Sequence, residues 1–197
     1  MKIAMNDPVI LTRHGEYVNL LDPQPATIDV RDIACALANI NRYTGHTTVP
    51  YSVAEHSIRV AELLKAEGYS VKSQLAGLLH DATEAYLGDV SSPLKSILPD
   101  YRALEKNLES VIELKFNVLI HNRPEVKAAD MNLLCAERHA LMPAVGDWQI
   151  LAGMDPDYVQ KQLCNHFKRG KIQWGNRTPG SVAKWFMICF NKLVTSC

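Results

Sequence analysis

The chain lacks a charge excess of either sign and any long apolar run. Its 21 Lys and Arg residues balance 21 Asp and Glu residues, so no net field attracts nucleic acid or an anionic membrane. The apolar stretch at residues 185–190 is far shorter than the roughly 20 residues that span a membrane. Residues 1–8 lack the long apolar core of a signal peptide. We therefore expect no membrane and no duplex nucleic acid among the partners.

Cysteine is scarce, and its spacing suggests no pairing. The five cysteines are odd in number and form no C-x-x-C pair, which is typical of reduced thiols in a cytoplasm. With 197 residues and no internal repeat or low-complexity tract, the chain can bury one sizeable core. We expect a single domain over residues 1–197.

What the chain does contain is mostly helical periodicity. Before the first helix, two short apolar runs at residues 9–12 and 17–20 flank Gly15, which predicts a small hairpin. The expected fold class is all-α with an N-terminal β-hairpin. Apolar spacing and capping signals predict helices over residues 29–41, from Ser52 onward, and over 70–87, 100–116, 124–142, 155–168 and 181–194.

A set of imidazoles and carboxylates interrupts the apolar helical sequence. His80 and Asp81 end the apolar run 75–79, His56 lies in the helix before them, and Asp130 lies in a later one. Ionisable groups in such segments are costly unless they are compensated, and a divalent cation compensates both carboxylates at once. Nitrogen and oxygen ligands without thiolates suit zinc, iron, cobalt, nickel or manganese. Alone, His56 or Asp130 is more simply a hydrogen-bonded core or surface residue.

Two further carboxylates follow the His80-Asp81 pair. If the helix continues, Glu84 shares one broad face with that pair. Gly88 then allows a sharp exit from the helix before Asp89. So many titratable groups in an otherwise apolar segment are hard to explain as solvated surface, which favours a functional site.

This pattern resembles the HD-domain metal-dependent phosphohydrolases, and is most similar to the branch containing bacterial 5'-deoxynucleotidases and phage dATP triphosphohydrolases. The resemblance covers residues 27–142 and implies an HD helical bundle as the core, with the hairpin in residues 1–26 and C-terminal helices in 143–197. It implies one divalent metal ion, zinc, cobalt or manganese, with additional magnesium as a further option. The implied metal ligands are His56, His80, Asp81 and Asp130. It also implies that Glu84 and Asp89 manage the water and the leaving group, with the division of roles open.

Substrate contacts are expected from two segments. The resemblance places Arg42 and Lys95 at the phosphate, where positive charge stabilises transferred negative charge. From the residues alone, the segment 42–48 is either a plain connecting loop or the lining of a nucleotide pocket. In the second case His46 donates to phosphate, and Tyr43 and Pro93 contact the base.

The implied function is a deoxynucleotide phosphohydrolase, in the narrower form a dATP-type triphosphohydrolase. Metal-activated water would attack the α-phosphate and release deoxynucleoside and triphosphate. A 5'-deoxynucleotidase acting on monophosphates and a catalytically silent HD nucleotide sensor are the alternatives. A triphosphate needs cations beyond Arg42 and Lys95, and His46, Arg59 and Arg13 are candidates. The resemblance further implies a homo-oligomer in the cytoplasm, or in the host cytoplasm if the chain is phage-encoded.

Overall fold

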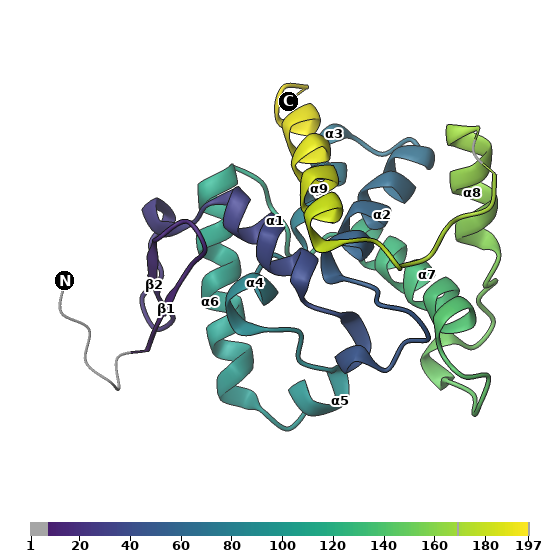
Figure 1. Ribbon diagram of the computed structural model, residues 1–197, viewed down its shortest axis with the longest axis horizontal. Helices are drawn as coiled ribbons and strands as arrows, with labels where there is room; N and C mark the ends of the chain where they lie inside the picture. Colours follow the sequence, from purple (N-terminus) through teal and green to yellow (C-terminus); the bar gives the residue numbers. More distant parts are fainter. Residues whose placement is uncertain (1–7, 169, 197) are drawn as a thin grey trace.

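The computed structural model describes residues 8–168 and 170–196, and these are mostly helical (Figure 1). The segment 1–7, on which the signal-peptide prediction rested, and Cys197 lie outside the described residues. No helix in the described part is long and apolar enough to cross a membrane. The helices are α1 (Val30–Asn39), α2 (Val53–Ala66), α3 (Val71–Leu79), α4 (Glu84–Leu87), α5 (Ser92–Lys95), α6 (Pro99–Phe116), α7 (Pro124–Leu141), α8 (Tyr158–Phe167) and α9 (Pro179–Val194), with 3-10 turns η1 (Pro25–Thr27), η2 (Arg42–Gly45) and η3 (Gln149–Leu151).

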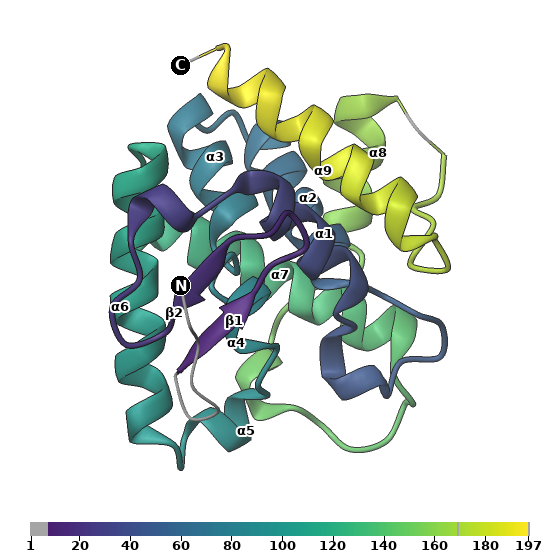
Figure 2. The ribbon, with the colours of Figure 1, turned by 60° about the vertical axis from the view of Figure 1, so that its left-hand side comes forward.

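The predicted N-terminal hairpin is confirmed. Strand β1 (Val9–Leu11) pairs antiparallel with β2 (Tyr17–Asn19), and Val18 lies opposite Ile10. Gly15, at φ +93°, takes the left-handed conformation that the turn requires. The hairpin lies beside α1 and α6 (Figure 2). Because Val18 is fully buried, it fixes the hairpin to the helical core.

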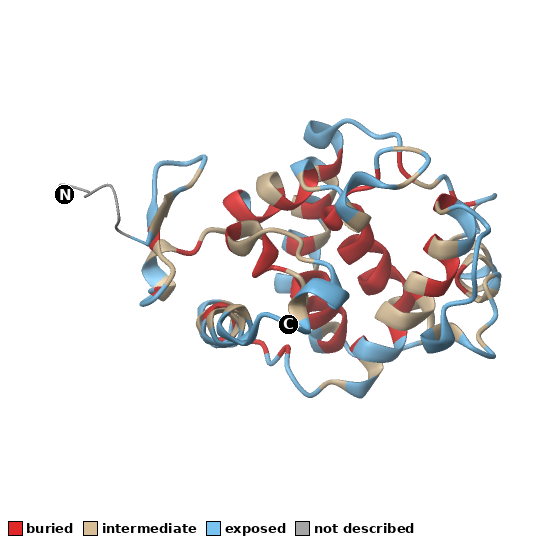
Figure 3. Cartoon of the chain, turned by 90° about the horizontal axis from the view of Figure 1, so that it is seen from below, coloured by how far each residue is buried: buried red, intermediate tan, exposed pale blue. Residues whose placement is uncertain are grey.

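Helix α2 forms the centre of the molecule. It packs against α1, α3, α7, α8 and α9, and all its residues from Val53 to Leu64 are buried. Figure 3 shows that the buried residues gather where the helices face one another, and that the exposed residues lie on the outside of the molecule. The helix begins as expected, because the Ser52 hydroxyl accepts a hydrogen bond from the Glu55 amide. Because other helices surround α2 on all sides, its polar side chains are also buried. His56, in the first turn of α2, is one of these buried polar residues.

The predicted single helix over residues 70–87 is wrong. Helix α3 ends at Leu79, residues 80–83 form turns, and the short α4 follows. The His80 ring nitrogen Nδ1 lies 2.8 Å from the Gly77 carbonyl oxygen. In a continuing helix that carbonyl would accept the Asp81 amide. The following amides bond to carbonyls three residues back instead, such as Glu84 to Asp81 at 3.0 Å. Glu84 is therefore placed by a tight turn, not by a shared helix face.

The other predicted helices are present with small shifts at their ends. The N-cap of α1 is Asp29, whose side chain accepts the Arg31 amide, and α7 begins at Pro124 as predicted. Helix α8 starts later than the predicted residue 155, and α9 starts earlier than residue 181 because Thr178 caps it. No disulfide joins the cysteines that the structure describes: Cys35, Cys135, Cys164 and Cys189.

Candidate metal centre

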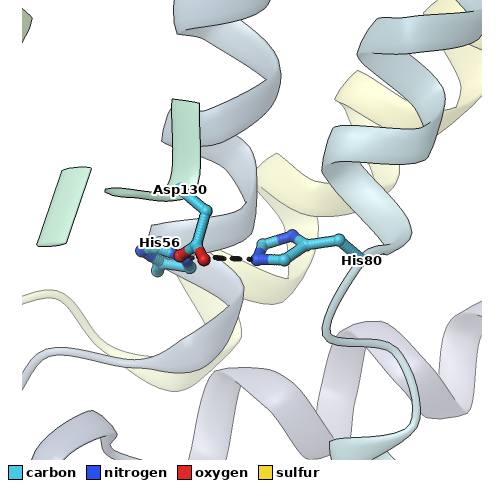
Figure 4. Close-up of side chains that lie close together, drawn as sticks. All are labelled: His56, His80 and Asp130. Atoms are coloured by element: carbon cyan, nitrogen blue, oxygen red, sulfur yellow. Dashed lines mark hydrogen bonds and ion pairs between the residues drawn. The ribbon is translucent and has the colours of Figure 1, made fainter. Parts of the chain in front are cut away.

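Three elements bring His56, His80 and Asp130 together in the interior (Figure 4). One ligand atom from each lies within 4.8 Å of the others. The two Nε2 atoms are 3.3 Å apart, and Asp130 Oδ1 is 3.2 Å from His56 Nε2 and 4.0 Å from His80 Nε2. Two imidazole nitrogens and a carboxylate converging on one point can hold a divalent metal ion.

Both imidazoles are oriented by a bond at the other ring nitrogen. His80 Nδ1 lies 2.8 Å from the Gly77 carbonyl oxygen, which can only accept, so Nδ1 carries the hydrogen. His56 Nδ1 lies 2.6 Å from Glu137 Oε1 and donates in the same way. Such outer bonds fix the ring and leave Nε2 as the atom that faces a ligand.

Asp81 lies beside this cluster. Its Oδ2 is 3.2 Å from His80 Nε2 and 3.8 Å from His56 Nε2, and it accepts a hydrogen bond from Arg42 Nη1 at 3.4 Å. All four residues that the resemblance implied as ligands are thus close in space. Burial alone would favour neutral carboxyls, yet the two histidines lower the pKa of Asp81 and of Asp130 well below the usual range.

The charge balance of the cluster fits a cation. Burial and Arg42 disfavour a charged His56, but Glu137 and Asp130 outweigh them and raise its pKa to about 9. The carboxylates around His56 therefore favour a positive charge at this point. Two imidazole nitrogens with two carboxylates form a donor set of nitrogen and oxygen atoms, so these residues fit a divalent metal ion.

Glu137 supports the cluster from behind, and the sequence pattern did not point to it. It is fully buried and lies on α7, where it binds His56. Its carboxylate also accepts hydrogen bonds from Arg42 Nε at 3.2 Å and from the hydroxyls of Tyr43 and Tyr51 at 2.9 Å each. Burial opposes its charge, but His56 and Arg42 lower its pKa. Its position seven residues after Asp130, two helical turns along one face, was the available signal.

Arg42 and Tyr43, predicted to bind substrate, belong to this supporting network. Arg42 joins Glu137 to Asp81, and its guanidinium lies 5.5 Å from the centre of the Tyr43 ring. Tyr43 and Thr44 take left-handed backbone conformations at φ +57° and +52°, an arrangement that costs energy outside glycine. The loop is therefore more than a connection, because its side chains complete the buried network. His46, by contrast, is exposed at the end of η2.

The predicted catalytic carboxylates lie together in a second part of the site. Glu84 is buried, and its Oε2 has no hydrogen-bond partner among the described residues. Burial, then the charges of Asp81 and Asp89, raise the pKa of Glu84 to about 10. Burial also raises the pKa of Asp89. Lys95 Nζ lies 3.7 Å from Glu84 Oε1 and 2.6 Å from Glu105 Oε1. Pro93 is exposed on α5.

A pocket of about 610 Å³ opens beside the cluster, and His80, Asp81 and Asp130 form part of its wall. Two cations that the sequence analysis did not select, Arg123 and Lys127, line the same pocket. The remaining polar lining residues are Glu109 and Asn122. None of the substrate contacts predicted from sequence is among the lining residues: Arg42, Tyr43, His46, Pro93 and Lys95. The candidate cations Arg13 and Arg59 line other pockets.

Fold and site together define a mostly helical protein with a partly buried His and Asp cluster that can hold a divalent metal. The chain is 38% identical over 128 residues to the uncharacterized protein YfdR of Escherichia coli (strain K12), covering 64% of this chain and 69% of the relative. The chain belongs to the same family as YfdR. It is also 41% identical over 109 residues to the uncharacterized protein RCAP_rcc00048 of Rhodobacter capsulatus, covering 53% of this chain and 56% of that relative. No family model matches the chain.

Proposed function

We propose that this protein is a metal-dependent deoxynucleotide phosphohydrolase of the HD-domain class. The observation that carries the proposal is the convergence of two imidazoles with Asp81 and Asp130, from segments far apart in the sequence. Three of these four residues, His80, Asp81 and Asp130, form part of the wall of one pocket. Each imidazole is oriented from behind, by Gly77 or by Glu137. Residues of a purely structural core would have no need of such a donor set.

The ligands of the ion are His56, His80, Asp81 and Asp130. A divalent cation held there would lower the pKa of a water and offset charge on a phosphate. It would also offset the charge of Asp81, which is the largest cause of the raised pKa of Glu84 after burial. Glu84, buried and with an unpaired oxygen, is the group that would accept the proton of the attacking water. Asp89, whose pKa is raised, donates a proton to the leaving sugar oxygen.

The narrower proposal is a dATP-type triphosphohydrolase that releases deoxynucleoside and tripolyphosphate. The pocket beside the cluster supports it, because its lining adds two cations, Arg123 and Lys127, for phosphates beyond the one attacked. Each of them also contacts a carboxylate, Glu125 or Asp130. Lys127 Nζ already lies 2.9 Å from Asp130 Oδ2, which places a cation directly beside a proposed ligand.

One observation favours a 5'-deoxynucleotidase instead. The two cations selected from the sequence are both engaged by carboxylates, Arg42 by Asp81 and Glu137 and Lys95 by Glu105. The acidic Glu109 also lines the pocket. A single phosphate requires fewer free cations than a triphosphate, so this arrangement fits a monophosphate substrate.

A substrate screen tests the proposal. The full chain is incubated with zinc, cobalt, manganese or magnesium and each deoxynucleoside mono-, di- and triphosphate, and the products are separated by chromatography. Deoxyadenosine and intact tripolyphosphate from dATP support the triphosphohydrolase, whereas orthophosphate from dAMP with dATP untouched supports the 5'-deoxynucleotidase. His80→Ala should remove either activity, while His166→Ala, an exposed histidine on α8, should not. Binding without turnover under every metal would identify a sensor and reject the proposal.

A further inference from the structure

A second pocket, of about 360 Å³, lies between α2 and the segment that connects α8 to α9. That segment crosses over α2 (Figure 1), and the Gln173 carbonyl accepts a hydrogen bond from Arg59 of α2 at 2.8 Å. This pocket shares no lining residue with the pocket beside the metal cluster. The residues on which its chemistry depends are Arg59, Lys171, Arg177 and Trp185.

Arg59 is a buried cation held in a fixed position. Only 3% of it is exposed, and its Nη2 donates to Glu55 Oε1 at 2.9 Å as well as to the Gln173 carbonyl. Its guanidinium lies 5.1 Å from the centre of the Trp174 ring and 5.5 Å from that of Trp185. Its Nε is buried and has no acceptor among the described residues. The group is thus preorganised, and part of its donor capacity is unmet.

A second guanidinium shares the same partners. Arg177 Nε lies 3.5 Å from Glu55 Oε1, the oxygen that Arg59 also contacts, and its guanidinium lies 5.2 Å from the Trp185 ring centre. One carboxylate therefore faces two guanidiniums. The exposed Lys171 adds a third cation that forms no ion pair within the described part of the chain. None of the described lining residues is acidic, so the pocket carries an excess of positive charge.

We propose that this pocket is a binding site for the phosphate group of a small anionic ligand, separate from the metal centre. Paired guanidiniums offer planar donors that match phosphate oxygens, and burial strengthens those bonds. The single carboxylate of Glu55 does not balance the positive charge of both guanidiniums. A bound phosphate would supply the missing negative charge. The site requires no metal, so its test is independent of the proposed hydrolase activity.

The test is direct binding to the full chain, measured by calorimetry with inorganic phosphate, pyrophosphate and dAMP as separate probes. The informative variant is Lys171→Gln with Arg177→Gln, because both side chains are on the rim and Arg59 is left in the core. Lys184→Gln with Lys192→Gln removes the same charge from exposed positions of α9 outside the pocket. Arg123→Gln with Lys127→Gln removes it from the metal-side pocket. Thermal melting of each variant verifies folding, and Lys171→Gln alone replaces the double variant if that one melts early.

The wild-type chain and the α9 control should bind at least one probe with equal affinity. The Arg123 and Lys127 variant should keep this binding event and can lose only a separate one at the metal-side pocket. The rim variant should bind that probe about tenfold or more weakly, because each lost charge-assisted hydrogen bond is worth about 1.5–3 kcal/mol. Tightest binding of inorganic phosphate indicates a free anion, and tightest binding of dAMP indicates a nucleotide. The proposal would be overturned if no probe bound to the wild-type chain. It would also be overturned if affinity fell equally in the α9 control, or if it fell only in the Arg123 and Lys127 variant.

Discussion

At the scale of single residues, His56 links the proposed ligand set to its support. Its Nε2 faces Asp130 and His80, while its Nδ1 is held by Glu137. Glu137 also binds Arg42 and two tyrosine hydroxyls, so one buried carboxylate orients a ligand and fixes the loop beside it. The sequence pointed to His56 but not to Glu137, because the spacing of seven residues from Asp130 places Glu137 on the same helix face without revealing its burial or its partners.

Glu137→Gln should lower metal affinity by about 10- to 100-fold, the usual effect of losing an outer partner of a ligand. Glutamine has nearly the same shape as glutamate but carries no charge. It therefore cannot orient the His56 ring, or raise its basicity, as strongly as the carboxylate does. Metal titration of the purified variant measures the loss. Glu125→Gln, a change at an ion-paired residue of the same helix, is the matched control and should retain wild-type affinity. Equal affinity in all three proteins would show that Glu137 does not support the ligand.

Glu84→Gln separates the proposed proton transfer from metal binding. The variant should keep its metal content and melting temperature, yet lose hydrolysis by about 100- to 10,000-fold, the usual contribution of a general base. Elemental analysis and initial rates measure the two effects. Glu105→Gln removes the other carboxylate beside Lys95 and should have a much smaller effect. If the metal is lost with Glu84, that residue has to be reassigned as a ligand.

At the scale of elements, apolar periodicity predicted where helices occur better than where they break. Periodicity reports which face is buried, and apolar residues recur on both sides of the turn at residues 80–83. The break depends on the contact between the His80 ring and the Gly77 carbonyl, which a one-dimensional pattern does not contain. The same contact orients His80, so the interruption of the helix and the geometry of the site have a common cause.

The close packing of α2 and α3 also depends on Gly77. A Cβ at this position would lie 2.5 Å from Leu64 Cδ1 and 3.1 Å from Val60 Cγ1. Because both neighbours are fully buried, Gly77→Ala should reduce the free energy of unfolding by about 1–3 kcal/mol through overpacking. Urea denaturation measures the change. Gly180→Ala in α9, where a Cβ meets nothing within 4 Å, is the control and should be neutral or stabilising. Equal stability of both variants would show that α3 can move away without loss.

At the scale of the whole molecule, the sequence pointed to residues that the structure brings close together, but not to their surroundings. The hairpin, most helices and the proximity of His56, His80, Asp81 and Asp130 agree with the expectation. The cations in the adjacent pocket, Arg123 and Lys127, were not predicted. Pockets form between segments that are distant in the chain, so the charges that line them follow from tertiary packing. The basic pocket around Arg59 was missed for the same reason.

The central claim is that the cluster of two histidines and two aspartates holds the metal ion on which hydrolysis depends. Asp81→Ala tests it most directly, because this residue contributes a carboxylate oxygen 3.2 Å from His80 Nε2. The Asp81 side chain is 19% exposed, so its removal should leave the fold intact. Metal content by elemental analysis and product release from dATP and dAMP are measured on the same preparation, with melting temperature as the test of folding. We predict that metal content and hydrolysis fall together while the protein remains folded. Full metal occupancy with normal turnover in this variant would contradict the account.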